Sequence, residues 1–277
     1  MKTSQAVNFG SEILKANKIL TYRLDSELIL ASILNTSREK LITSNLKIPK
    51  KNFSKFKDLI RRRSSKEPIA YILKKKEFVS ENFFVDYKSL IPRPETELLI
   101  EPIIKHFKNK RLFFLDIGTG SGCILISILK NVDGSRGVGI DICNQTLINC
   151  RKNLLTFNLI NRARVLHKSI DKLNDMKFDL IVANPPYIIK REFHRLPQDI
   201  KKFEPRIALD GGNDGLDVFR KVIYKSKYLL KSNGILALEI GTGQFSQVNS
   251  LLNENNFKNK ILVKDYKNNI RCIFSTL

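Results

Sequence analysis

Several features that would assign a chain to a specialised class are missing from this sequence of 277 residues. No apolar run approaches the roughly 20 residues that a membrane span needs. Residues 1–18 contain no uninterrupted apolar segment, so we expect no secretion signal. The four cysteines form no CxxC pair and the three histidines lie far apart. We therefore expect reduced thiols in a cytoplasmic protein, with neither a disulfide framework nor a metal site.

The chain is strongly basic, with a formal net charge of +22. Such a charge is compatible with direct nucleic-acid binding, because basic side chains supply the sequence-independent part of that affinity. The lysines and arginines are nevertheless scattered, with local clusters only at 61–63 and 74–76. We attribute the charge to composition, so nucleic-acid binding is not required. Because no self-complementary stripe is evident, we expect a monomer.

The first 76 residues show the apolar periodicity of helices, which predicts a small helical domain. Two stretches place apolar residues on one face each: Leu24, Leu28, Ala31 and Leu34 in the first, and Phe53, Phe56 and Ile60 in the second. We expect a linker over residues 77–97, which begins with a β-hairpin turning at Ser80, Glu81 and Asn82 and ends in a proline-rich segment.

Strands and helices alternate over residues 98–277, which predicts an α/β domain with a mostly parallel, Rossmann-like sheet. The candidate strands are 112–117, 136–141, 163–168, 178–183 and 235–240. Residues 261–277 read as two more strands about a turn at Lys267, Asn268 and Asn269. We therefore expect the sheet to end in an antiparallel C-terminal strand pair.

A glycine-rich loop follows the first of these strands and leads into an apolar helix. It consists of Gly118, Thr119, Gly120, Ser121 and Gly122. Glycines after a parallel strand let the backbone turn tightly and approach a ligand, although they could also only shape the turn. The dinucleotide pattern G-x-G-x-x-G would need a third glycine where Cys123 stands, which argues against a pyrophosphate ligand.

An acidic residue, Asp141, ends the next strand, where its carboxylate can accept hydrogen bonds from two ribose hydroxyls. Asp116, just before the glycine loop, would place negative charge beside the same ligand. A ribose without a pyrophosphate indicates S-adenosylmethionine, whose product after methyl transfer is S-adenosylhomocysteine. We interpret the loop and Asp141 as the site of this cofactor.

The strand at 178–183 ends on Asn184, Pro185, Pro186 and Tyr187. Two consecutive prolines cannot continue a ladder, and alone they indicate only a turn. At the carboxyl edge of the sheet, however, the Asn184 side-chain oxygen and the Pro185 carbonyl form a rigid pair of acceptors for a planar NH₂ group. Tyr187 can stack on that group. We interpret this tetrapeptide as a catalytic site that aims the nitrogen at a methyl group, in line with its sulfonium leaving group.

These motifs resemble those of methyltransferases that act on DNA adenine, RNA guanine and protein glutamine. Longer stretches are similar to one family, the bacterial release-factor glutamine methyltransferases (PrmC/HemK): RRRSSKEPIAYILKKKEF, SLIPRPETE, FEPRIALDGGNDGLDVF and LEIGTGQ. The resemblance extends over nearly the whole chain from about Tyr22. Lys74 is a departure, because the family usually has a glycine there.

The resemblance implies a helical domain that docks a peptide-chain release factor and a class I methyltransferase domain. The latter would methylate N5 of the glutamine in the factor's Gly-Gly-Gln motif. It also implies that residues 118–122 contact the methionine part of the cofactor, and that Asp141 binds its ribose. Ile170 would contact the adenine, and residues 184–187 would hold the glutamine amide.

A further segment has family counterparts that we interpret as a loop folding over the site: Glu204, Arg206, Gly211, Gly212 and Gly215. Its Asp-Gly-Gly sequence could equally form only a turn.

Two alternatives compete with glutamine methylation. An N-methyltransferase of DNA adenine or rRNA guanine would share the Asn-Pro-Pro-Tyr motif and would suit the positive charge. Against it, we find no separate target-recognition domain, and the basic residues do not gather with aromatic ones as in single-strand binders. A non-catalytic binding module would need a damaged site, whereas the loop, the acid and the tetrapeptide are all intact.

Overall fold

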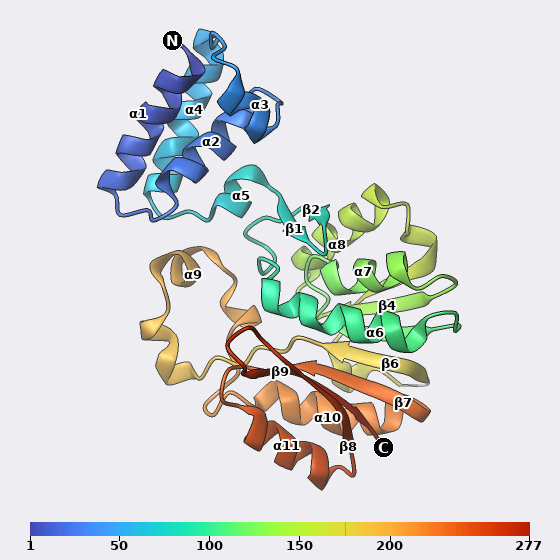
Figure 1. Cartoon of the computed structure of the whole chain (residues 1–277). Coiled ribbons are helices and arrows are strands. Elements are labelled where there is room, and N and C mark those ends of the chain that lie inside the picture. The colour runs from blue at the N-terminus through green and yellow to red at the C-terminus, as the bar shows by residue number, and fades with distance from the viewer. Residues whose placement is uncertain (175) are drawn as a thin grey trace. The chain divides into compact units, whose positions relative to one another are not determined.

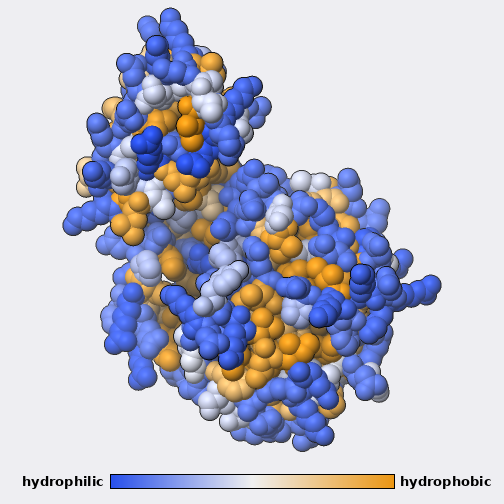
Figure 2. All heavy atoms as spheres, viewed as in Figure 1, coloured by the Kyte–Doolittle hydropathy of each residue, from blue (hydrophilic) through white to orange (hydrophobic). Residues whose placement is uncertain are grey.

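The computed structural model describes residues 1–174 and 176–277 (Figure 1). They form two compact units, Met1–Lys75 with Pro197–Phe203, and Lys76–Leu196 with Glu204–Leu277. Hydrophilic side chains are spread over the visible face of both units (Figure 2). Within the described ranges, no helix combines the length and the apolar character that crossing a membrane requires.

The first unit is helical. Its helices are α1 (Thr3–Ala16), α2 (Tyr22–Ile33), α3 (Arg38–Thr43), α4 (Lys50–Ser64), α5 (Ile69–Leu73) and α9 (Gln198–Phe203). Buried apolar side chains of α1, α2 and α4 form its core, with Leu14, Ile29 and Phe56 at the centre. The predicted face of α4 is confirmed, because Phe56 and Ile60 are buried and Phe53 is half-buried.

The face predicted for α2 is wrong in part. Leu24 is exposed, and the helix instead buries Ile29 and Leu30 together with a polar run, Asp25, Ser26 and Glu27. Each polar group has a partner: Arg63 Nε donates to Asp25 at 2.6 Å, Arg23 and Arg38 donate to Glu27, and the Ser26 hydroxyl donates to the Val7 carbonyl. Apolar periodicity carries no information on such partners, and a buried charge is tolerated only when it is paired.

The second unit contains a hairpin and a larger sheet. The hairpin strands are β1 (Lys76–Phe78) and β2 (Glu81–Phe83), and the sheet strands are β3 (Phe113–Ile117), β4 (Arg136–Asp141), β5 (Ala163–His167), β6 (Phe178–Ala183), β7 (Leu230–Glu239), β8 (Lys258–Lys264) and β9 (Ile270–Thr276). The sheet has the order β5-β4-β3-β6-β7-β9-β8, with β9 antiparallel to both neighbours and all other pairs parallel. The predicted α/β fold is confirmed, including the antiparallel C-terminal pair.

The predicted strands agree with the structure to within a residue, except that β7 and β8 begin earlier than predicted. The hairpin turn is displaced from its predicted position. Val79 and Ser80 form it, with φ of 48° and 58°, whereas Glu81 and Asn82 already belong to β2. A two-residue turn matches the twist of the paired strands when both residues have positive φ, even without the usual Gly or Asn.

Helices cover both faces of the sheet (Figure 1). They are α6 (Ile100–Phe107), α7 (Cys123–Asn131), α8 (Asn144–Thr156), α10 (Asp217–Leu229) and α11 (Phe245–Glu254), with 3₁₀ helices η1 (Pro94–Leu99), η2 (Ile160–Arg162), η3 (Ile170–Lys172), η4 (Lys190–Arg195) and η5 (Arg206–Ala208). Alternate strand residues point to opposite faces, so Phe114 packs with α6, α7 and α8, whereas Leu115 packs with α10 and α11. The strands are therefore buried on both sides, as their continuous apolar sequences require.

Gly10, on α1, marks the tightest packing in the first unit. A Cβ at this position would lie 2.5 Å from Ser26 Oγ, 2.7 Å from Phe56 Cζ and 2.9 Å from Ile60 Cδ1. We predict that Gly10→Ala lowers the free energy of unfolding by about 1–2 kcal/mol, because overpacking outweighs the gain in helix propensity. Chemical denaturation with hydrogen exchange of the α1 amides measures the change.

The matched control for this prediction is Asn8→Ala, which changes an exposed position of the same helix. It should be neutral or slightly stabilising. Equal stability of the two variants would contradict the packing argument.

Candidate active site

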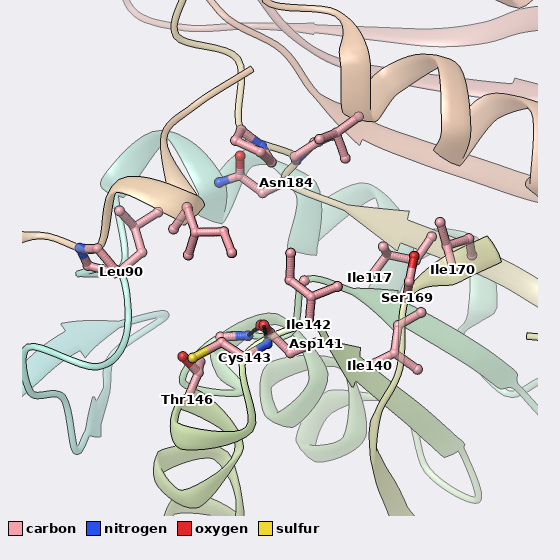
Figure 3. A pocket seen from close by; sticks show the side chains of 18 of the residues that line it. Leu90, Ile117, Ile140, Asp141, Ile142, Cys143, Thr146, Ser169, Ile170 and Asn184 are labelled. Carbon is pink, nitrogen blue, oxygen red and sulfur yellow. Dashed lines mark hydrogen bonds between the residues drawn. The ribbon is translucent and has the colours of Figure 1, made fainter. Parts of the chain in front are cut away.

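Segments that follow the carboxyl ends of β3, β4 and β6 surround a cavity of about 300 Å³, which is within the size range of small-molecule sites. Figure 3 shows Asn184 on one side of this cavity, with Asp141, Cys143 and Thr146 opposite. Further lining residues include apolar and basic ones, Leu90, Ile117, Ile140, Ile142, Ile170, Lys88, Lys168 and Lys221, together with Ser169 and Asp210. All of them belong to the second unit.

The glycine loop lies at one end of the cavity. Gly118 and Gly120 line it, and their φ values of 71° and 57° favour glycine, which has no Cβ. The amides of Gly118 and Thr119 both donate to the Ile140 carbonyl, at 2.9 and 3.0 Å, so the loop is tied to β4. Gly122 faces away, because a Cβ there would lie 2.8 Å from Cys150 Sγ on α8. Ser121 is buried behind the loop.

Asp141 is held in place by the backbone on both sides. Its Oδ2 accepts from the Gly120 amide at 3.1 Å, and its Oδ1 accepts from the Cys143 amide at 2.9 Å. Burial raises the pKa of this carboxyl, and the two hydrogen bonds act against the rise. Because each carboxylate oxygen has two lone pairs, Asp141 can still accept hydrogen bonds from hydroxyl groups in the cavity.

Asp116 does not lie beside the cavity, contrary to its predicted place. It is completely buried beneath the loop, where its Oδ2 accepts from the Thr119 hydroxyl at 2.7 Å. Burial raises its pKa to about 7, so near neutral pH only part of the molecules carry this charge. The sequence places Asp116 next to the loop but does not show that its side chain points into the sheet core.

Asn184 lies at the end of β6 with its side chain at the cavity. Its Nδ2 donates to the hydroxyl of Thr96, on η1, at 3.0 Å. Thr96 is buried and is not among the residues that line the cavity. The amide nitrogen therefore has a partner outside the lining of the cavity, whereas within the described residues the side-chain oxygen accepts no hydrogen bond. Pro185 and Pro186 line the cavity next to it.

Tyr187 is fixed from behind rather than lining the cavity. Its carbonyl accepts from Gln244 Nε2 at 3.2 Å, and its ring lies 6.0 Å from the Arg271 guanidinium. Burial raises the pKa of its hydroxyl. The predicted stacking of Tyr187 on a substrate group thus stays a prediction.

The segment after Glu204 covers the tetrapeptide, as predicted. Pro205, Ile207 and Ala208 line the cavity, and the Gly211 amide donates to the Ile188 carbonyl at 2.9 Å. Gly211 packs so closely that a Cβ would lie 2.8 Å from Tyr187 Cα. Glu204 anchors the start of this segment, because it accepts from Arg93 Nη2 at 2.5 Å.

Four supporting residues were not identified from the sequence as parts of the site: Thr96, Glu239, Gln244 and Arg271. Thr96 lies in the family-like stretch SLIPRPETE, and Glu239 and Gln244 lie in LEIGTGQ, so these stretches were the available signal. No residue pattern connects Arg271 to the site. Within residues 1–174 and 176–277, no three His, Cys, Asp or Glu side chains gather as a metal ion would require.

Comparisons with known proteins agree with this architecture. Residues 5–73 match the model of the PrmC N-terminal domain, and residues 94–200 match that of the methyltransferase small domain. The release factor glutamine methyltransferase of Clostridium botulinum is 36% identical over 95% of each chain. That of Clostridium acetobutylicum is 34% identical over 99% of this chain and 98% of its own.

Solved structures share the fold at low identity. A methyltransferase from Pyrococcus furiosus matches 80% of this chain and 98% of its own, with a TM-score of 0.54 and 18% identity. A ribosomal protein L11 methylase from Lactobacillus delbrueckii subsp. bulgaricus matches 68% and 80%, with a TM-score of 0.51 and 21% identity. The fold is thus that of methyltransferases, and identity over nearly full length is decisive for the family: this chain belongs to the release factor glutamine methyltransferases.

Proposed function

We propose that this protein transfers a methyl group from S-adenosylmethionine to N5 of the glutamine in the Gly-Gly-Gln motif of peptide-chain release factors. The observation that carries the proposal is the orientation of Asn184. Its nitrogen donates a hydrogen bond to Thr96, which leaves its oxygen without a partner, and the residue lines a cavity bounded by the glycine loop and Asp141. Only an acceptor at this position can bind the hydrogens of an amide NH₂.

The cavity fits the proposed cofactor by its chemistry. Asp141 offers carboxylate lone pairs for a ribose, Gly118 and Gly120 leave room for close approach, and Ile170 with Ile142 offers apolar surface for a base. Lys88, Lys168 and Lys221 border the cavity and suit an amino-acid carboxylate. When bound, S-adenosylmethionine would supply an electrophilic methyl group: the N–CH₃ bond would form as the S–CH₃ bond breaks, and the amide nitrogen would lose one proton to water.

The tetrapeptide overcomes the weak nucleophilicity of an amide nitrogen, whose lone pair is delocalised. The Asn184 oxygen and the Pro185 carbonyl would accept one hydrogen each, which raises electron density on the nitrogen and fixes its direction. Positioning and oriented dipoles then supply most of the acceleration. Because the backbone of 185–187 is constrained by prolines and by the bond from Gln244, these acceptors need little reorganisation.

The helical first unit would serve to dock the release factor. This role is supported by the match of residues 5–73 to the PrmC N-terminal domain and by near full-length similarity to enzymes named for release factors. A monomer in the cytoplasm is the form that we propose to act on this protein substrate.

The choice of acceptor is tested with methyl-labelled S-adenosylmethionine and three acceptors in parallel. These are a release factor, the same factor with its loop glutamine replaced by alanine, and unmethylated DNA with rRNA. We expect label on the intact factor alone. Label on the nucleic acid but not on the factor would reject the proposal and favour an exocyclic-amine methyltransferase.

Removing the Asn184 carboxamide should remove one of the two acceptors that bind the hydrogens of the substrate amide. We predict that Asn184→Ala lowers kcat by about 100-fold or more, the scale of losing one transition-state contact. Cofactor affinity and thermal stability should stay nearly unchanged. The control Asn131→Ala removes an amide of α7 that bonds only within its helix, and it should keep full turnover. If Asn184→Ala keeps the wild-type kcat, the Asn184 oxygen does not contribute to catalysis.

Neutralising Asp141 should weaken cofactor binding. We predict that Asp141→Asn raises the Kd for S-adenosylmethionine by about tenfold or more, because hydrogen bonds to a charged acceptor contribute about 1.5–3 kcal/mol. Isothermal titration calorimetry gives the value. Asp133→Asn, a change at an exposed position after α7, is the matched control and should bind normally. Equal Kd values for both variants would remove Asp141 from the cofactor site.

A further inference from the structure

Helix α8 buries three polar side chains on one of its sides. Thr146, Asn149 and Asn153 are separated by three and four positions, so they share a face of the helix, and their exposed fractions are only 5%, 2% and 1%. A buried polar side chain is costly unless it is hydrogen-bonded. The partners of these three side chains therefore account for the polar face.

The main partner is residues 84–90, a segment of the linker that we call the strap. It belongs to no helix or strand. The Asn149 amide donates to Asp86 Oδ1 at 2.7 Å and to Ser89 Oγ at 3.2 Å. Because the strap lies outside the sheet, side chains of α8 take the place of a strand partner for it.

Asn153 joins the strap to the glycine loop. Its Oδ1 accepts from the Phe84 amide at 2.8 Å, and its Nδ2 donates to the Phe84 carbonyl at 3.0 Å. The same Nδ2 donates to the Ser121 carbonyl at 2.8 Å, inside the loop. Both hydrogens of the carboxamide are thus used, together with its oxygen. An aspartate or a leucine has a similar shape, but neither has a donor for the two carbonyls.

The strap also supplies part of the cavity wall (Figure 3). Lys88 and Leu90 line the cavity, as does Thr146, whose hydroxyl donates to the Lys88 carbonyl. Gly118 and Gly120 of the glycine loop line it too. Side chains of α8 thus connect two segments that both belong to the proposed cofactor site.

We propose that Asn149 and Asn153 are positioning residues of the cofactor site, which hold the strap and the glycine loop at a fixed spacing before S-adenosylmethionine binds. The inference rests on the proposed function, because it concerns the cofactor of that reaction. Neither asparagine is among the described residues that line the cavity, so both act through the segments that they hold. A site that is assembled in only a fraction of the molecules binds its ligand with a Kd raised by the inverse of that fraction.

The role is tested first by cofactor affinity, measured by titration calorimetry. We expect Asn153→Ala, which removes the bonds to both segments, to raise the Kd for S-adenosylmethionine by about tenfold or more. With a release factor and saturating cofactor, kcat should stay within about twofold of the wild type, because saturation restores the assembled site. A merely structural role predicts the reverse pattern, since a loss of folded protein lowers the binding stoichiometry and kcat but not the affinity.

Two further variants complete this test. Val248→Ala removes buried packing between the sheet and α11, so it should lower thermal stability and leave the Kd unchanged. Asn149→Ala removes only the bonds to Asp86 and Ser89 and leaves the link to the glycine loop in place. It should raise the Kd by about threefold, and it provides the test if Asn153→Ala does not fold.

Hydrogen exchange measures the same role without turnover. In the absence of cofactor, the amides of the strap should exchange about tenfold faster or more in Asn153→Ala than in the wild type, because the strap opens more often. The amides of β6 and β7 should exchange at the wild-type rate. Adding S-adenosylmethionine should slow exchange in the strap of both proteins.

The outcomes separate the two hypotheses. A wild type that does not bind S-adenosylmethionine would reject the proposed function. Wild-type binding with an unchanged Kd in both asparagine variants would overturn only the positioning role. A raised Kd with wild-type exchange in the strap would overturn it as well, because the strap would then not carry the effect.

Discussion

The parallel course of β3, β4 and β6 is the constraint on which the site depends. Parallel strands bring their carboxyl ends to one edge, so the glycine loop, Asp141 and Asn184 meet there although they lie far apart in the chain. The strands are apolar on both faces and are covered by α6, α7 and α8 on one side and by α10 and α11 on the other. Hydrophobic cores on both faces of the sheet therefore hold this edge in place, which keeps the residues at the cavity rigid.

Two family-like sequence stretches, SLIPRPETE and LEIGTGQ, contain no proposed catalytic residue. Their side chains instead hold residues 184–187 in place. Thr96 from SLIPRPETE engages the Asn184 amide, and Gln244 from LEIGTGQ engages the Tyr187 carbonyl. Gly211 lies against Tyr187 from a third direction. A hydrogen-bond acceptor can direct a substrate amide only if it cannot relax, and three independent segments restrain it here.

The buried carboxyl groups of the two units differ in how far positively charged side chains compensate them. In the first unit, Asp25 and Glu27 are buried but paired with arginines, so their charges are compensated. In the second unit, Asp116 and Glu239 are buried with few partners, and burial raises the pKa of each to about 7. Groups of this kind gather at functional sites more often than elsewhere, and both lie next to the cavity elements.

The sequence by itself determined the fold class, the strands, the glycine loop, the acid at the end of β4 and the tetrapeptide after β6. Each of these is local, because periodicity, glycine and proline act on neighbouring residues. Only the tertiary structure decided which face of α2 is buried, that Asp116 points into the core, and that Thr96 accepts a hydrogen bond from the Asn184 side chain. Those outcomes depend on partners that are distant in the chain, such as Arg63 for Asp25 and Thr96 for Asn184. Asn184 and Thr96 are 88 positions apart, so no periodic pattern in the sequence indicates their hydrogen bond. The two side chains come together only once the sheet has formed.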